Sequence, residues 1–135
     1  MTQRIFILFL AALAGCSAAP ADPAGARLFG EWGGDHIALA IDNGGADVES
    51  DCAHGRIAGP FEVDAAGAFS LSGVWSPEHG GPVREGEEDA AQPARYSGRI
   101  AGKAMTLTID IASPPARLGP FAPEKDRSPN LMKCY

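Results

Sequence analysis

Three histidines are the residues of this chain best suited to metal chemistry. They are His36, His54 and His79, and each has the glycine-rich or polar neighbours typical of loops. Neutral imidazole is the commonest transition-metal ligand, so these rings with Asp35 or Glu78 would suffice for a catalytic or transport site. Their spacing does not bring them together, and surface or hydrogen-bonded loop histidines are the competing interpretation. We therefore treat them as weak metal candidates and expect no cofactor.

The serines and glycines form no familiar catalytic motif. The chain has no Gly-x-Ser-x-Gly sequence, and Ser97-Gly98 falls within a predicted strand. Gly80-Gly81-Pro82 is not followed by a predicted helix, which a phosphate-binding loop would need. We expect a protein that is not an enzyme, with a metal-dependent enzyme as the alternative.

Residues 76–93 are rich in proline, glycine and acidic side chains, and we predict a long loop there. Loops longer than about 12–15 residues are often functional, because a rigid scaffold can present them to a partner. A solvated insertion is the alternative, since a run of like charges usually faces water. The candidate binding residues in this loop are Glu78, His79, Arg84, Glu85, Glu87, Glu88 and Asp89.

The N-terminal residues combine a cation, a short apolar run and a cysteine. Arg4 precedes apolar residues 5–13, a run too short for a permanent membrane-spanning helix. The run ends in Leu13-Ala14-Gly15-Cys16, which resembles the lipobox of bacterial lipoproteins. The resemblance implies cleavage before Cys16 and a diacylglycerol on its thiol. Because Ser17 rather than an aspartate follows, it also implies an outer-membrane anchor facing the periplasm. An ordinary secretory signal is the alternative.

Two cysteines remain once Cys16 is assigned to lipidation. In an oxidising compartment Cys52 and Cys134 are expected to form a disulfide, which would join the last predicted strand to the second. A metal site is the alternative, because Cys52-Ala53-His54 brings a thiol close to an imidazole. Structural zinc usually needs a second such pair, which the chain lacks.

Length and composition favour one small, acidic β domain. The 135 residues carry a net charge of −6, which argues against binding to nucleic acid or to an anionic lipid surface. The 17 glycines and 11 prolines suit an all-β protein with many turns. We predict a signal peptide over residues 1–15, a lipidated N-terminus and flexible linker over 16–28, and a single β domain over 29–135.

Apolar residues alternate with polar ones in several short segments. Asn43-Gly44 indicates a hairpin turn, and the clearest strand runs from Met105 to Ile111. Further strands are predicted over 37–41, 48–52, 61–64, 69–75, 96–100, 118–121 and 131–135. Together these favour a small antiparallel up-and-down barrel of about eight strands, with a β-sandwich as the alternative.

Two weak resemblances concern the folded part. Gly30-Glu31-Trp32 resembles the Gly-x-Trp motif of lipocalins, whose tryptophan closes one end of an eight-stranded barrel; Arg127 or Lys133 would be its basic companion. The lipobox, the predicted barrel and a cysteine near the C-terminus also resemble the membrane-bound lysozyme inhibitors. Ala94-Arg95-Tyr96-Ser97 is the stretch that suggests their inhibitory loop.

The sequence therefore predicts a lipid-anchored envelope protein with a non-catalytic binding domain. Its partner would be an envelope protein, and the acidic charge suits a cationic hydrolase that it would inhibit. A lipocalin-like carrier of a small apolar ligand is the first alternative, and a metal-binding protein using the three histidines is the second.

Overall fold

The computed structural model describes residue 15 and residues 25–82, 84–85 and 91–135. This part of the chain is all β, and none of it forms a helix long and apolar enough to cross a membrane. The strands are β1 Ala26–Arg27, β2 Gly30–Gly34, β3 Ile37–Asp42, β4 Gly45–Ser50, β5 Ala53–Ala58, β6 Glu62–Val63, β7 Ala68–Pro77, β8 Gln92–Ala101, β9 Ala104–Ala112, β10 Pro115–Phe121 and β11 Glu124–Lys125.

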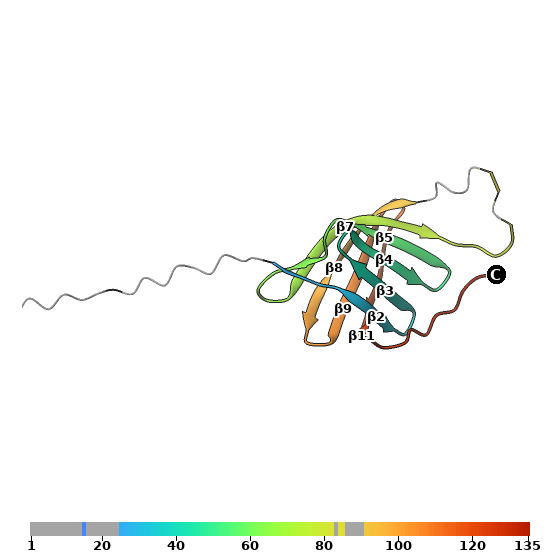
Figure 1. The fold of residues 1–135 in the computed structure, drawn as a ribbon. Coiled ribbons are helices and arrows are strands. Elements are labelled where there is room, and N and C mark those ends of the chain that lie inside the picture. Colours follow the sequence, from blue (N-terminus) through green and yellow to red (C-terminus); the bar gives the residue numbers. More distant parts are fainter. Residues whose placement is uncertain (1–14, 16–24, 83, 86–90) are drawn as a thin grey trace, which may run out of the picture.

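Eight strands form a closed antiparallel barrel (Figure 1), which confirms the predicted fold class. Their order is β2-β3-β4-β5-β7-β8-β9-β11, and β11 pairs back with β2. The closing strand is short: Glu124 faces Ala104 on one side and Gly33 on the other. β10 lies outside the closed ring as an extra strand on the edge of β9, and β1 pairs only with β6.

The alternation in the sequence explains the barrel interior. Along β3 the apolar residues Ile37, Leu39 and Ile41 are buried, and Met105, Leu107 and Ile109 are buried in the same way along β9. Period-two alternation places every second side chain on one face, and closing the sheet turns that face inward. The largest fully buried side chains are Trp32, Tyr96, Phe61, Ile37, Leu39, Ile57, Met105, Leu107, Ile109, Val48 and Pro123. The barrel therefore encloses a packed core.

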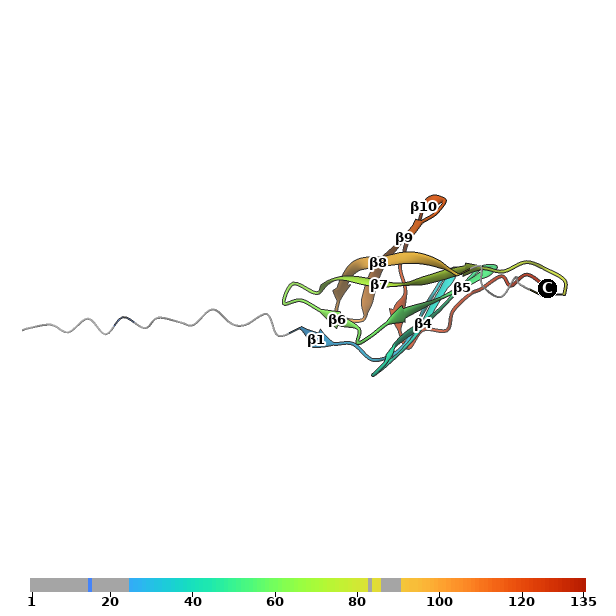
Figure 2. The same cartoon turned by 90° about the horizontal axis from the view of Figure 1, so that it is seen from above.

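The two ends of the barrel carry different parts of the chain. β1, β6 and the hairpin turn after Asp42 lie at one end, whereas the turns at 35–36 and 51–52, the start of the loop after β7 and the C-terminus lie at the other (Figures 1 and 2). After β11 the chain returns along β2 as an irregular segment over residues 126–135, which we call the C-terminal strap. The strap makes one parallel bridge, between Asn130 and Asp35.

Several strands of the structure differ from the predicted ones in their bounds or their existence. Cys52 was predicted to end a strand but occupies a two-residue turn with φ of 50°, and residues 131–135 belong to the strap rather than to a strand. The strap forms one bridge and no ladder. Pro123 and Pro129 lie on either side of its start, and a proline has no backbone N–H to donate to a ladder. β10 begins at Pro115, earlier than predicted, and β5 was not predicted because His54, Gly55 and Arg56 interrupt its apolar residues.

The hairpin at Asn43-Gly44 forms as predicted, with Asp42 facing Gly45. The positive φ, however, is found at Gly45, with a value of 143°, rather than at the two central positions. β1 falls inside the segment predicted as linker, and Leu28 N donates to the carbonyl of Phe61. The contacts of the barrel therefore reach back at least to Ala26.

Candidate functional site

The end of the barrel that holds the C-terminus is fixed by a disulfide. Cys52 and Cys134 are bonded, with their Cα atoms 5.0 Å apart and 82 positions between them in sequence. The predicted disulfide is thus present in the structure, although its second cysteine lies on the strap. The bond joins the strap to the β4–β5 turn, and we call this region the disulfide end.

Hydrogen bonds from the strap backbone hold the residues that precede Cys134. Asn130 N donates to Gly34 O at 3.0 Å, and His36 N donates to Asn130 O at 2.8 Å. Closer to the C-terminus, Cys52 N donates to Met132 O and Met132 N donates to the Asp51 carboxylate at 2.7 Å. A Cβ on Gly80 would meet the backbone of Tyr135, so the end of the strap lies against the loop after β7.

Lys133 is the centre of the polar contacts at the disulfide end. Its Nζ donates to the carbonyls of Ser50 and Ala53 and forms ion pairs with Glu49 at 2.5 Å and Glu78 at 3.2 Å. Partial burial disfavours the charged amine, but the two carboxylates outweigh it and raise the pKa of Lys133. One cation from the strap therefore ties together β4, β5 and the residue that follows β7.

Two histidines at this end are each paired with a carboxylate. His36 Nδ1 lies 2.5 Å from Asp51 Oδ2, and His54 Nδ1 lies 2.7 Å from Glu78 Oε1. The backbone N–H of Met132 and then His36 lower the pKa of Asp51. Burial alone would raise the pKa of Glu78, but hydrogen bonds from His54 and Lys133 lower it below its ordinary value. Both carboxylates are thus held charged by the strap and the histidines.

A carboxylate beside an imidazole is part of the arrangement that activates a serine or cysteine nucleophile. In the described residues, no hydroxyl or thiol is hydrogen-bonded to either imidazole. Ser50 lies near His36, but it is buried and its hydroxyl donates to the carbonyl of His36 at 2.7 Å. The geometry therefore fits anchoring of turns and strap better than nucleophilic catalysis.

The three candidate metal ligands are kept apart. His36 and His54 face different carboxylates, and His79 Nδ1 lies 3.1 Å from the carbonyl of Gly80. Within the residues that the structure covers, no three His, Cys, Asp or Glu side chains gather where they could hold a metal ion. His54 also differs from expectation, because it lies on β5 and not in a loop.

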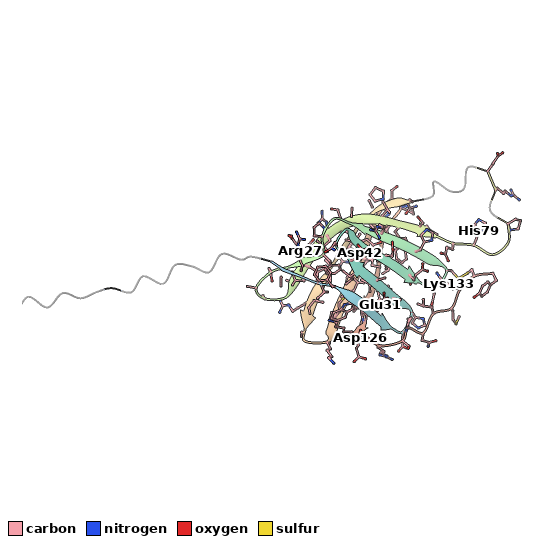
Figure 3. All side chains as sticks on the ribbon, viewed as in Figure 1. Arg27, Glu31, Asp42, His79, Asp126 and Lys133 are labelled. Carbon is pink, nitrogen blue, oxygen red and sulfur yellow. A yellow bond between two sulfur atoms is a disulfide. The ribbon has the colours of Figure 1, made fainter. Side chains whose placement is uncertain are left out.

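The predicted binding loop begins at the disulfide end. Glu78 is fixed there by His54 and Lys133, and Figure 3 shows His79 beyond the strands on the same side of the barrel as Lys133. Arg84 and Glu85 are both exposed. Glu87, Glu88, Asp89 and the predicted lipidation site Cys16 lie outside the described residues.

Gly30 and Trp32 lie on β2, away from the disulfide end. Trp32 is buried, its Nε1 donates to Phe29 O at 3.4 Å, and Gly30 has φ of 98°. The register places Lys125 of β11 opposite Trp32, and a Cβ on Gly30 would contact the Lys125 side chain. Lys125 thus lies beside this motif, whereas Lys133 contacts Glu49 and Glu78 at the other end.

Sequence reasoning missed Glu49 and Asp51 as partners of the strap and gave Lys133 a different role. Glu49 and Asp51 lie at alternate positions in and just after β4, so their common face was predictable; Glu49 is exposed there and Asp51 is half-buried. Nothing in a linear pattern pairs them with residues some 80 positions later, except the cysteine at 134. A charged residue next to a disulfide cysteine was the available signal.

In comparisons with protein-family models, curated proteins and solved structures, nothing matched this chain.

Proposed function

We propose that this protein is a lipid-anchored lipoprotein of the bacterial outer membrane, facing the periplasm and attached through Cys16. Its barrel is a non-catalytic binding domain for a cationic envelope protein, and inhibition of a cationic hydrolase is the activity we favour. The lipobox resemblance supports the anchor. The distribution of charge over the barrel supports the choice of partner.

The observation that carries the proposal is a wall of carboxylates on one side of the barrel. Residues 26–66 contain eight acidic side chains and only two basic ones. Both cations have partners: Arg27 lies 3.7 Å from Glu62, and Arg56 lies 2.7 Å from Asp47. The strap adds two more cations on this side, because Arg127 lies 3.7 Å from Asp35 and Lys133 lies 2.5 Å from Glu49. The acids on β2–β4 and their turns form what we call the acidic wall. Glu31, Asp35, Asp42, Asp47 and Glu49 are exposed, and Asp51 is half-buried.

The acidic wall has the properties of a protein-docking surface. Glu31, Asp47 and Glu49 project from strands that are hydrogen-bonded on both sides, so a rigid scaffold holds them in place. Surfaces of one sign attract oppositely charged partners over several ångströms and raise the rate of association. Figure 3 shows Glu31 and Asp42 on this side of the barrel. A cationic protein is the partner whose charge matches.

The packed interior favours this function over a carrier. Trp32, Phe61 and Tyr96 are all 2% exposed or less and fill the space that a carried ligand would need. A ligand inside the barrel would have to displace aromatic side chains, and interiors packed in this way resist expansion.

The fold also suits an anchored protein that displays one end. The chain enters the barrel through β1, at the end opposite the disulfide (Figure 2). A lipid on Cys16 would therefore leave the disulfide end and its loop directed away from the membrane. The ten residues between Cys16 and Arg27 would span about 33 Å if fully extended.

Labelling the full chain with radioactive palmitate in bacteria tests the anchor. We expect label on the wild type and none on Cys16→Ser, with the wild type recovered in the outer-membrane fraction. Equal labelling of both proteins would overturn the anchor assignment.

Inhibition of a lysozyme, used as a probe cationic hydrolase, tests the partner. We expect the full chain in non-ionic detergent to inhibit lysozyme, and the double variant Glu31→Gln/Asp42→Gln to inhibit about two- to fivefold less. A loop variant neutralising residues 85–89 tests whether the loop contributes. Asp110→Asn removes one carboxylate from the other side of the barrel and is the matched control. Inhibition that is absent, or equally reduced by the control, contradicts the proposed partner.

A further inference from the structure

The long strands opposite the acidic wall carry the reverse charge. Residues 92–121, which include β8, β9 and β10, contain Arg95, Arg99, Lys103 and Arg117 but only one acid, Asp110. In the order of strands around the barrel, β8 and β9 lie across from β3 and β4. An acidic chain therefore has one side with a local excess of positive charge.

The register arranges these charges in a row across the strands. Arg95 on β8 faces Asp110 on β9, which in turn faces Arg117 on β10. Arg117 Nε donates to the Asp110 carboxylate at 2.7 Å, and Arg95 donates to Ser70 Oγ on β7 at 3.0 Å. Arg99 follows four residues after Arg95 on the same exposed face of β8. We call Arg95, Arg99, Arg117 and the hydroxyl residues between them the basic wall.

Hydroxyl side chains fill the space between the arginines. Ser97 faces Thr108 in the register, and Arg99 faces Thr106. Ser70 and Ser72 occupy the neighbouring positions on β7, opposite Ser97 and Arg95. Hydroxyls and guanidinium groups together offer many hydrogen-bond donors for oxyanions and sugar hydroxyls.

A shallow depression of about 400 Å³ adjoins this row of charges. Arg95 and Asp110 lie at its polar side, and Pro93 and Ile111 contribute an apolar part. A site with an apolar floor and a few polar groups suits a sugar ring, which has an apolar face and a polar edge.

The spacing of the arginines selects a ligand with repeated charges. Neighbouring strands are about 4.8 Å apart, so the backbones at Arg95 and Arg117 are about 10 Å apart. The backbones at Arg95 and Arg99 are about 13 Å apart along β8. A polymer with repeated anionic groups can contact all three guanidinium groups at once, whereas one carboxylate or phosphate is too small to bridge all three. A membrane surface fits less well, because interfacial binding uses apolar side chains as well as cations. Among the described residues of β7–β10, Val74 alone is a large apolar side chain that is exposed.

We propose that the basic wall binds an anionic polysaccharide through its repeated carboxylate or phosphate groups. This surface is separate from the acidic wall, so the protein would hold a cationic partner on one side and an anionic polymer on the other. Asp110 weakens the attraction, because it neutralises part of the charge of Arg117 and faces Arg95.

Binding of fluorescently labelled polygalacturonate to the full chain, in non-ionic detergent at low ionic strength, tests the proposal. We expect anisotropy to rise with polygalacturonate but not with neutral dextran, and added salt to weaken the binding. Arg95→Gln and Arg99→Gln should each weaken it about two- to fivefold, and Asp110→Asn should strengthen it by a similar factor. Arg56→Gln removes the same charge from β5 and should leave binding unchanged.

Each contrary result has a defined meaning. No binding by the wild type, or a loss for Arg56→Gln equal to that for Arg95→Gln, would overturn the proposal. Binding to vesicles of anionic phospholipid without binding to polygalacturonate would also overturn it, in favour of a membrane surface. Lysozyme inhibition is measured separately and depends on the acidic wall, so either proposal can fail while the other stands.

Discussion

The acidic wall and the basic wall belong to one closed sheet, yet they are stabilised in different ways. The strands of the acidic wall are five or six residues long, and the strap, the disulfide and Lys133 hold them at one end. β7, β8 and β9 on the other side have nine or ten residues and long continuous ladders. Because each cross-strand pair adds to the stability of a sheet, we expect the short strands to depend more on the disulfide and the strap than the long ones do. The predictions below test this difference.

Removing the disulfide should have the largest effect. In the chain-entropy treatment, a loop closed over 82 residues is worth about 4–5 kcal/mol, and strain or residual structure usually reduces this. We expect Cys52→Ala/Cys134→Ala to lose about 2–5 kcal/mol of unfolding free energy in urea titrations. The rate of amide hydrogen exchange should rise more in β4, β5 and the strap than in β8 and β9. Uniform acceleration would show that the two walls do not differ in this way.

A methyl group at Gly55 should have the next largest effect, at the seam where the two walls meet. A Cβ there would overlap the Tyr96 hydroxyl and lie 2.7 Å from the carbonyl of Val74. Overpacking of this kind costs about 1–3 kcal/mol, so Gly55→Ala should lower the urea midpoint accordingly.

The Tyr96 hydroxyl provides an internal check of that explanation. It donates to Val74 O at 2.6 Å, so Tyr96→Phe should itself lose about 1 kcal/mol. Adding it to Gly55→Ala removes the closer of the two overlapping atoms and leaves the Val74 carbonyl, so the double variant should be less destabilised than the sum of the single ones. Strict additivity would contradict the overlap.

The pH dependence of stability should come from the disulfide end. Asp51 and Glu78 have folded-state pKa values below their ordinary 3.8 and 4.5, so their contribution is present above about pH 5 and is lost as the pH falls through the folded values. Lys133 has a raised pKa, so its contribution is present below 10.5 and is lost as the pH rises through its folded value. Urea titrations across this range should show a plateau that falls on both sides.

Lys133→Met should flatten the alkaline side of that plateau and cost about 1 kcal/mol at neutral pH. Lys125→Met, which changes the charge equally but lies at β11 outside this cluster, is the control. If both variants have the same pH profile, the cluster around Lys133 is not the source of the dependence.

The smallest effect is expected on the basic wall. Arg117 and Asp110 form a close ion pair, but the Arg117 side chain is 74% exposed. Water screens such pairs, and they seldom add measurable stability. Arg117→Gln should leave the urea midpoint unchanged, and a clear shift would mean that β10 depends on this pair for its position.

Local alternation was sufficient to predict most strands and the barrel. Met105 to Ile111 forms β9 almost as predicted, and Cys52 and Cys134 are bonded. The closing strand was not predictable, because Glu124 and Lys125 form only two residues of ladder and show no period. Nor was the strap: Leu131 to Tyr135 looks like a strand in sequence, but its hydrogen bonds go to turns.

The candidate site was less predictable than the fold, since its contacts join distant parts of the chain. Net charge, which is a sum over all residues, concealed the basic wall. Alternation within β8 would have placed Arg95 and Arg99 on one face, but only the pairing of β8, β9 and β10 adds Arg117 and Asp110 to the same row.

The positions of the two bonded cysteines also determine how the protein would respond to a protease. Arg84 is exposed and lies between Cys52 and Cys134 in sequence, within the connection from β7 to β8. A trypsin cut after Arg84 would give two fragments that still migrate together on a gel until a reductant is added. Because β7 and β8 remain paired along their full ladder, the nicked barrel has the means to stay folded after the chain is broken.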